Sequence, residues 1–409
     1  MEFYKRWMES SVRTSLKTWR AVSIVGARQC GKTTLGQSLP SKTMIARSLD
    51  NSMFLQSALE DPESFVRHDD GTTLFIDEIQ KAPSLLPAIK GQVDRTNATG
   101  QFLLTGSANL HTLPDVTESL AGRLHSVRLR TLAEGEIRGT NPNFPAMAFS
   151  GDLPAHIDGC DKQQILALAF RGGYPEAVRV GTSKRGTWHR DYIDHLLRHD
   201  IQDVAEIRKL DKLRAVFTFL AARSSKLWNI SEIATSLEIS KASVENYVAA
   251  LESLYLFDRV EAWTSRDYER TLKRPKWFIG DTGLMCTHLK WHPDNIAFDS
   301  DRCGKLVESW VYHELASALD TIDGYSIFHY RDREQREIDF ILENDDGALV
   351  GIEVKSSALV NTDDFRHMEW FRTNLGGERW KQSIVLYSGS DTLSFGKGKL
   401  AVPLFSLFL

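Results

Sequence analysis

The sequence has few cysteines and no long apolar segment, and each shortage argues against a class of protein. Its four cysteines lie far apart and form no C-x-x-C pair, which argues against a zinc ribbon or a disulfide framework. No window approaches the roughly 20 apolar residues of a membrane span. The charged N-terminus lacks the apolar core of a secretory signal. We therefore expect a cytoplasmic protein that does not associate with a membrane.

The chain also lacks a strong charge of either sign. It has 50 Lys and Arg residues against 54 Asp and Glu residues, a net charge of -4. This balance excludes a globally basic nucleic-acid coat and leaves room for a local basic patch. At about 150 residues per domain, the 409 residues correspond to two or three domains.

The pattern of apolar residues divides the chain into three parts. Short apolar segments at Ala21–Val25, Thr73–Ile76 and Phe102–Leu104, separated by helical patterns, predict a parallel α/β sheet in an N-terminal domain, residues 1–140. Thr140–Gly159 is rich in proline and glycine, which is typical of a linker or a surface loop. We expect a helical domain over 160–280. Strand-like segments then return in an α/β domain over 281–409.

A phosphate-binding loop follows the first of these strands. The segment fits G-x-x-x-x-G-K-[ST] in full and precedes a helical stretch that includes Thr34. In such a loop the backbone N–H groups surround the phosphates, Lys32 contacts the β- and γ-phosphates, and the Thr33 hydroxyl binds Mg²⁺. The loop consists of Gly26, Ala27, Arg28, Gln29, Cys30, Gly31, Lys32 and Thr33.

Two adjacent carboxylates follow the second strand. Asp77 and Glu78 end the segment LFIDE, and their mutual repulsion is unfavourable unless a cation lies nearby. We expect Asp77 to hold Mg²⁺ through water and Glu78 to polarise the attacking water as a catalytic residue. After the third strand, Thr105 and Ser107 are both candidates for the residue that senses the γ-phosphate.

An arginine can also act in nucleotide hydrolysis, by neutralising charge in the transition state across a subunit interface. Arg123, in ESLAGR, is a candidate for this arginine finger, and a solvated surface arginine is the alternative. Arg28 is a weaker candidate of the same type.

The helical middle contains a helix-turn-helix spacing. Apolar positions over Ser231–Leu237 and Ala242–Leu254 predict two short helices joined by a turn. Strands around Tyr255–Trp263 and Lys276–Ile279 would add the wing of a winged helix. Contact with DNA phosphates and a purely structural role both remain open. The cations expected to contact DNA are Lys241, Arg266, Arg270, Lys273, Arg274 and Lys276.

The C-terminal part holds a pattern of carboxylates and lysine. Asp339 lies on one predicted strand, and Glu353 and Lys355 share one face of the next. Glu308, on the preceding helical stretch, can complete the set. Carboxylates that hold Mg²⁺ beside a lysine that activates water are the arrangement of the PD-(D/E)-x-K nucleases. A salt-bridged sheet surface is the alternative.

Taken together, these motifs resemble a known family. GARQCGKTTL, LFIDEIQKAPSLLPAIK, FLLTGSANL, ESLAGR, GGYPE, IGDTGL and REIDFIL…GIEVKSS occur in that order. The chain resembles the prokaryotic AAA-type ATPases that carry a C-terminal restriction-endonuclease-like domain of uncharacterised function. The resemblance implies an AAA-like core that binds ATP, a winged-helix middle and a PD-(D/E)-x-K-like end.

We therefore expect a Mg²⁺-dependent ATPase that binds DNA and couples ATP hydrolysis to DNA remodelling or translocation. Branched and single-stranded DNA are both candidate substrates, and an arginine finger acting between subunits would require a homo-oligomer such as a ring. One alternative is an ATP-gated DNA nuclease. Another is a signalling ATPase whose winged-helix and C-terminal domains dock a protein partner.

Overall fold

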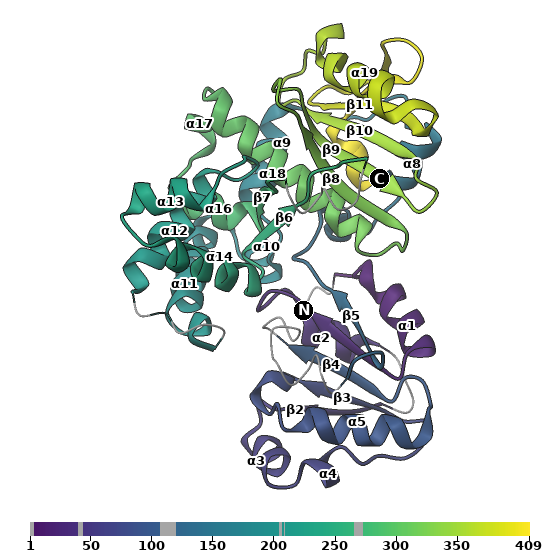
Figure 1. Cartoon of the computed structure of the whole chain (residues 1–409), viewed down its shortest axis with the longest axis vertical. Coiled ribbons are helices and arrows are strands. Elements are labelled where there is room, and N and C mark those ends of the chain that lie inside the picture. Colours follow the sequence, from purple (N-terminus) through teal and green to yellow (C-terminus); the bar gives the residue numbers. More distant parts are fainter. Residues whose placement is uncertain (1–3, 40–43, 107–119, 204–206, 208, 266–272) are drawn as a thin grey trace. The chain divides into compact units, whose positions relative to one another are not determined.

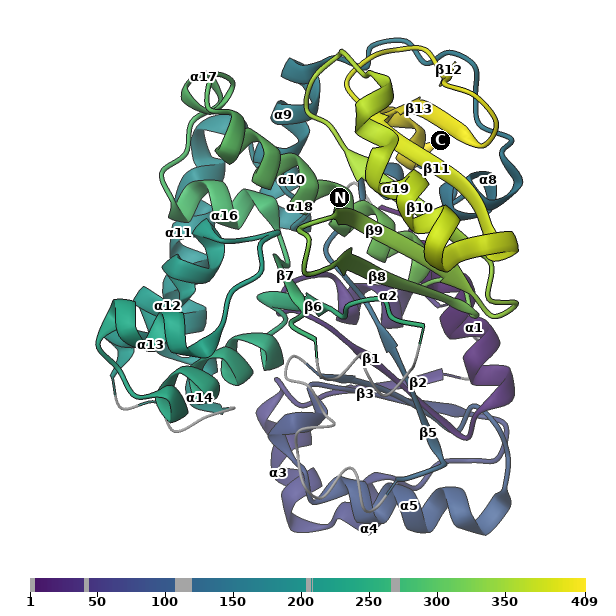
Figure 2. The same cartoon turned by 45° about the horizontal axis from the view of Figure 1, so that its top comes forward.

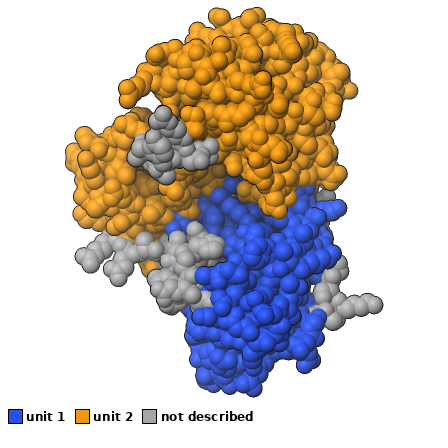
Figure 3. Space-filling model, turned by 45° about the vertical axis from the view of Figure 1, so that its right-hand side comes forward, with its two compact units in different colours: residues 1–131, 253–255 blue, residues 132–252, 256–409 orange. Residues whose placement is uncertain are grey.

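A computed structural model describes residues 4–39, 44–106, 120–203, 207, 209–265 and 273–409. The chain forms two compact units, shown in separate colours in Figure 3. Unit 1 comprises residues 1–131 and 253–255, and unit 2 comprises residues 132–252 and 256–409. Within the described residues, no helix combines the length and apolar character needed to cross a membrane.

Unit 1 is built on a five-stranded parallel sheet of strand order β2-β3-β4-β1-β5. The predicted parallel sheet is therefore confirmed. β1 and β4 are buried along their whole length, because helices of a parallel sheet cover both of its faces. The strands are β1 (Ala21–Val25), β2 (Met44–Ser48), β3 (Thr73–Asp77), β4 (Phe102–Gly106) and β5 (Leu124–Arg128).

Helices connect successive strands from β1 to β4, and one further helix precedes β1 (Figure 1). A short 3₁₀ turn, η1 (Ile79–Lys81), follows β3. The helices are α1 (Met8–Thr18), α2 (Lys32–Ser38), α3 (Ser52–Glu60), α4 (Pro62–Phe65) and α5 (Leu85–Thr96).

Unit 2 begins with the helical part of the chain. The expected linker over 140–159 is in part a helix, because Phe144 and Ala148 of α8 are buried in the core of the unit. Asp161 and Asn229 cap α9 and α13 by accepting backbone N–H groups of the first turn. The helices are α7 (Glu134–Arg138), α8 (Phe144–Ser150), α9 (Lys162–Arg171), α10 (Pro175–Arg179), α11 (Thr182–Arg198), α12 (Leu210–Ala222), α13 (Ile230–Leu237) and α14 (Lys241–Ser253).

Further along unit 2, a two-stranded antiparallel ribbon precedes the C-terminal sheet. That sheet has the order β12-β13-β11-β10-β9-β8 and is seen from a second side in Figure 2. The elements are β6 (Phe257–Val260), β7 (Lys276–Ile279), α16 (Thr282–His288), α17 (Pro293–Ile296), α18 (Ser300–Leu319), β8 (Tyr325–Arg331), β9 (Glu337–Asn344), β10 (Leu349–Val354), α19 (Arg366–Phe371), β11 (Trp380–Tyr387), β12 (Leu393–Ser394) and β13 (Lys399–Pro403).

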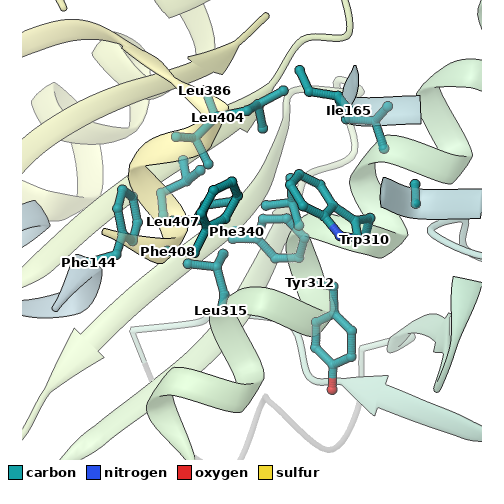
Figure 4. Close-up of a cluster of buried hydrophobic side chains, with 14 of the residues drawn as sticks. Phe144, Ile165, Trp310, Tyr312, Leu315, Phe340, Leu386, Leu404, Leu407 and Phe408 are labelled. Carbon is teal, nitrogen blue, oxygen red and sulfur yellow. The ribbon is translucent and has the colours of Figure 1, made fainter. Parts of the chain in front are cut away.

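One hydrophobic core joins the helical and sheet parts of unit 2. Figure 4 shows side chains of α8, α9 and α18 packed against those of the sheet and the C-terminal turn. Trp310 and Leu315 of α18 lie in this cluster with Phe340 of β9 and Phe408. The parts expected as separate domains at 160–280 and 281–409 thus share a core and form one compact unit.

Candidate functional sites

The phosphate loop joins β1 to α2 and is shaped by left-handed backbone. Gly26, Gln29 and Gly31 have φ angles of 154°, 60° and 106°, and such turns direct successive N–H groups toward one concavity. A Cβ on Gly26 would lie 2.1 Å from the carbonyl oxygen of Leu129. The neighbouring strand end therefore leaves room for glycine alone at this position.

Lys32 lies inside this loop. Its side chain is buried, and Nζ donates to the carbonyl oxygens of Gly26 and Ala27, both at 2.9 Å. An ammonium has three N–H donors, so one remains beyond these two bonds for a phosphate oxygen. Lys32 is thus held within the loop where the sequence predicts phosphate binding.

Asp77 accepts hydrogen bonds from three hydroxyl groups at the carboxyl edge of the sheet. Oδ1 accepts from Thr33 Oγ1 at 2.8 Å and from Thr105 Oγ1 at 2.5 Å, and Oδ2 accepts from Ser48 Oγ at 3.1 Å. Because β4 lies between β1 and β3, Thr105 stands between the loop and the acidic strand end. The structure therefore brings the two nucleotide motifs together. Ser107, the other candidate sensor, lies outside the described residues.

Glu78 leaves the strand in a left-handed conformation, with φ 60°. Its backbone N–H donates to Thr105 Oγ1 at 3.2 Å, and its carboxylate accepts from the amide of Gln80. A non-glycine residue with positive φ is uncommon, and such strain is frequent at functional sites. The bend separates the side chain of Glu78 from that of the buried Asp77.

Two residues of the site, Arg6 and Ser48, were not predicted from the sequence. Arg6 is buried and donates to the carbonyl oxygens of Cys30 and Arg130, both at 2.8 Å, so it supports the phosphate loop from the chain before α1. Ser48 belongs to no sequence motif. The pairing of β2 with β3 places it opposite Asp77. Cys30 is buried and donates through Sγ to the Leu129 carbonyl at 3.3 Å.

Arg123 lies at the opposite edge of the sheet. It directly precedes β5, and its carbonyl oxygen accepts from the N–H of Ala21, the first residue of β1. The phosphate loop follows the other end of β1. Arg123 therefore cannot reach the nucleotide site of its own chain. Its guanidinium makes a bidentate ion pair with Asp94, at 2.5 and 2.9 Å.

In unit 2, a buried lysine lies among the predicted nuclease-like carboxylates. Nζ of Lys276 is 2.6 Å from Glu308 Oε1, 2.9 Å from Glu337 Oε1 and 3.1 Å from Asp339 Oδ1. Its side chain is only 1% exposed. The expectation that Lys276 contacts DNA is therefore wrong, because its charge is taken up by this carboxylate cluster.

The rest of the predicted nuclease-like set lies beside the cluster. Asp339 Oδ2 accepts from the N–H of Val354 at 3.0 Å. Lys355 Nζ is 3.5 Å from Glu353 Oε1 and 3.3 Å from Asp364 Oδ1. The structure thus brings Glu308 and Asp339 together around Lys276, while Lys355 joins Glu353 to a residue of another element.

Burial and charge perturb these groups strongly. Burial, with the charge of Asp339, raises the pKa of Glu308 to about 7, and burial raises the pKa of Glu353 well above its usual value. Burial alone would lower the pKa of Lys276, but the charges of its three carboxylate neighbours raise it well above normal. Lys276 is therefore an ammonium ion. Within the described part of the chain, no group of three or more acidic, histidine or cysteine side chains is arranged to hold a metal ion.

The predicted helix pair and ribbon are both present. α13 and α14 are joined by a short turn, and β6 pairs with β7. Lys241, Lys273 and Arg274 are exposed. The backbone before β7 is fixed, since the carbonyl oxygen of Arg274 accepts from His329 Nε2 at 3.1 Å. Arg266 and Arg270, the other cations expected on the wing, lie outside the described residues.

Comparison with known proteins assigns the N-terminal part to a class. Residues 18–138 match the family model described as "AAA domain". Together with the phosphate loop and the acidic end of β3 on a parallel sheet, this match makes unit 1 an AAA-type P-loop domain, the ATP-binding domain of a class of ATP hydrolases. Residues 162–295 and 303–407 match two models that are each described as a domain of unknown function.

Two similar bacterial proteins are each described as uncharacterised. An uncharacterised protein of Mycobacterium tuberculosis is 26% identical over 405 residues, which cover 98% of this chain and 83% of its own. An uncharacterised protein of Haemophilus influenzae is 26% identical over 206 residues, 48% of each chain.

Similar solved structures include DnaA and RuvB of two bacteria. AMPPCP-bound DnaA of Aquifex aeolicus has a TM-score of 0.30 and 14% identity, over 60% of this chain and 86% of its own. The Holliday junction branch migration motor RuvB of Thermotoga maritima has a TM-score of 0.29 and 17% identity, over 70% and 94%. At these scores nothing about the function of this chain follows from the likeness.

Proposed function

We propose that this chain is a Mg²⁺-dependent ATPase that binds DNA and couples ATP hydrolysis to DNA remodelling or translocation. The observation that carries the proposal is the set of hydroxyl groups around Asp77, which links the phosphate loop to the acidic strand end. In this proposal Lys32 binds the β- and γ-phosphates, and Glu78 orients the water that attacks the γ-phosphate. Thr105 senses the γ-phosphate through its bond to Asp77.

The donor set beside the phosphate loop fits Mg²⁺. Thr33 Oγ1 and the carboxylate of Asp77 are hard oxygen ligands in direct contact with each other, and Mg²⁺ prefers one or two such ligands together with phosphate oxygens and water. Bound there, the ion would neutralise charge that develops on the phosphates. Thr33 and Asp77 would hold it, and Ser48 and Thr105 would orient the carboxylate.

A homo-oligomer is part of the proposal. Because Arg123 directly precedes β5, at the edge of the sheet remote from the phosphate loop, it acts on the nucleotide of a neighbouring subunit. Its ion pair with Asp94 would then be exchanged for contact with the γ-phosphate. A ring is the simplest closed assembly in which every site receives such an arginine.

The DNA contact is assigned to exposed cations of unit 2. Lys241 begins the second helix of the helix pair, and Lys273 and Arg274 precede β7 on a backbone that is held in place by His329. Phosphate contacts from such residues supply the sequence-independent part of DNA affinity. Lys276 is not among them. These residues favour contact with the DNA backbone over recognition of base sequence.

The carboxylate cluster disfavours the nuclease alternative. A PD-(D/E)-x-K site needs a divalent cation between its carboxylates, and here the ammonium of Lys276 lies within 3.1 Å of three of them. A metal ion at that position would have to displace a buried lysine. We therefore assign the C-terminal sheet a binding or structural role in the ATPase.

The DNA part of the proposal is tested by fluorescence anisotropy. Labelled single-stranded, duplex and forked DNA are titrated with the full-length protein at 50 and 200 mM salt. We expect binding that weakens with salt, and we expect the double variant Lys273→Ala/Arg274→Ala to lower the log–log salt slope by about 2. The control, Lys381→Ala/Lys397→Ala, removes two exposed lysines of the C-terminal sheet region and should change nothing.

Two results would contradict the DNA contact. Absence of binding to every DNA at 50 mM salt would favour the signalling ATPase that docks a protein partner. Equal weakening by the two double variants would show that these cations act only through net charge.

A further inference from the structure

A cavity of about 680 Å³ lies in the helical part of unit 2. It is lined by residues of α11, α12 and α16 and of the segment that follows α16. Figure 1 labels these three helices. Small-molecule sites in proteins have volumes of roughly 300–1,000 Å³. The cavity is therefore large enough for a ligand the size of a nucleotide, and it lies wholly outside the AAA domain.

The lining of this cavity is cationic. Arg185 and Arg190 come from α11, Arg214 from α12 and Lys290 from the segment after α16, whereas Asp194 is the one carboxylate that lines it among the described residues. Arg214 Nη2 is 2.7 Å from Asp194 Oδ1 and is thereby neutralised.

The other three cations have no carboxylate partner in the described part of the chain. Arg185 Nε donates to the carbonyl oxygen of Ala177 at 2.8 Å, and Arg190 Nη2 donates to Thr187 Oγ1 at 3.0 Å. Both arginines keep further N–H donors, and Lys290 is exposed. Three positive charges from two segments of the chain thus surround one space.

A buried histidine lines the same cavity. His189 is 1% exposed, and its Nδ1 forms a 2.9 Å hydrogen bond with Thr287 Oγ1. Its Nε2 is buried and has no hydrogen-bond partner among the described residues. An unpaired polar atom of this kind costs about 1–3 kcal/mol, which a ligand atom within hydrogen-bond distance would recover. Burial lowers the pKa of His189, so the ring is neutral at pH 7.

We propose that this cavity binds a ligand that carries a phosphate group and has the size of a nucleotide. Arginine forks match phosphate oxygens, and His189 supplies one further polar contact from the buried side. Trp291 and Phe170 give the same cavity an aromatic wall on which a base or a sugar can pack. A free nucleotide and the phosphorylated end of a nucleic acid present the same chemistry. The site acts separately from the phosphate loop, so the inference does not depend on the proposed function.

The test is isothermal titration calorimetry on full-length Lys32→Ala protein, which weakens phosphate binding at the phosphate loop. The probes are AMP, a 5′-phosphorylated dinucleotide and adenosine, which carries no phosphate. The double variant Arg190→Ala/Lys290→Ala removes two exposed cations of the cavity. Its matched control, Lys184→Ala/Arg198→Ala, removes two exposed cations of α11 that do not line the cavity.

We expect a 5′-phosphorylated probe to bind, and we expect the cavity variant to weaken it at least tenfold while the control stays within twofold. Binding of AMP identifies a free nucleotide as the source of the phosphate, and binding of the phosphorylated dinucleotide alone identifies a nucleic-acid end. Equal binding of adenosine would overturn the proposal. So would equal effects of the two double variants, or no binding of either phosphorylated probe at millimolar concentration.

Discussion

Thr33 Oγ1 donates a 2.8 Å hydrogen bond to Asp77 Oδ1, although the two residues are 44 positions apart in the chain. The bond exists because α2 starts at the phosphate loop while β3 ends at the same edge of the sheet. It places a hydroxyl and a carboxylate, the two protein ligands expected for Mg²⁺, in contact. The same carboxylate oxygen also accepts from Thr105, so one acid connects three strands and the loop.

Replacing the Thr33 hydroxyl should remove the Mg²⁺ ligand without disturbing the fold. Thr33→Val keeps the shape of the side chain but leaves Asp77 with one donor fewer, and we expect ATP turnover to fall by about 10²-fold. Thr33→Ser keeps the hydroxyl and should stay within a few-fold of the parent. Turnover at a series of Mg²⁺ concentrations measures both variants. A Val variant as active as the Ser variant would remove Thr33 from the metal site.

Glu78→Gln should separate ATP binding from ATP hydrolysis. The amide retains the size of the side chain but accepts a proton poorly, so turnover should drop by about 10²–10⁴-fold while the affinity for ATP stays close to that of the parent. A fluorescent ATP analogue reports the affinity, and phosphate release reports the turnover. Loss of affinity and turnover together would mean that Glu78 supports the loop structurally instead.

Gly26→Ala should destabilise unit 1, because the new Cβ would lie 2.1 Å from the Leu129 carbonyl oxygen on a residue with φ 154°. We expect a loss of about 2 kcal/mol or more in the free energy of unfolding, measured by urea titration. Gly91→Ala is the matched control, since Gly91 lies within α5 and a Cβ there meets no atom within 4 Å. That control should stabilise by about 1 kcal/mol. Equal effects of both changes would contradict the packing described for the phosphate loop.

Lys276→Met should destabilise unit 2, because it leaves the buried carboxylate cluster without its cation. Removing one partner from a buried ion pair typically costs about 3–5 kcal/mol, and here Glu308, Glu337 and Asp339 would lose a shared cation. Thermal unfolding without nucleotide measures the effect. Added Mn²⁺ should not stabilise the parent protein, because Nζ of Lys276 already lies between these carboxylates. Stabilisation of the parent by Mn²⁺ at this site would instead revive the nuclease interpretation.

Acid should destabilise unit 2 through His329. Burial lowers its pKa to about 4, below the value of about 6.5 in an unfolded chain. The unfolded state therefore binds the proton first, and the contribution of this group is present above pH 6.5 and is lost as the pH falls toward 4. The loss should reach about 3 kcal/mol. His329→Gln, which keeps a donor for the Arg274 carbonyl, should reduce this loss between pH 6.5 and 4. The part that remains includes the contribution of His288, whose pKa burial also lowers to about 4. An unchanged profile would assign the acid sensitivity to other groups.

The sequence predicted the central strands of unit 1 and missed its edges. β1, β3 and β4 are apolar segments because they are buried on both faces. β2 and β5 border the sheet and are largely half-buried or exposed, so their residues show no apolar pattern. Ser48 was missed for this reason, and Arg6 because its contacts with Cys30 and Arg130 depend on tertiary structure. The helix α8 was not predicted because it contains Pro145 and lies in a segment rich in proline and glycine, although its Phe144 and Ala148 are buried in the core.

Lys276 shows why the C-terminal interpretation needed the structure. In the sequence it follows Lys273 and Arg274, and it therefore looked like one more cation of an exposed wing. Its carboxylate partners Glu308 and Asp339 are 32 and 63 residues away. The sequence pattern predicted that carboxylates such as Glu308 and Asp339 lie close together. It did not show that Lys276 lies between them.

The most direct test of the account is the rate of ATP hydrolysis by the purified full-length protein, alone and with single-stranded, duplex and forked DNA. The account predicts turnover that requires Mg²⁺, disappears in Lys32→Ala and rises with at least one form of DNA. Turnover retained in Lys32→Ala would contradict the nucleotide site. Mg²⁺-dependent turnover that no DNA changes would contradict the coupling of hydrolysis to DNA.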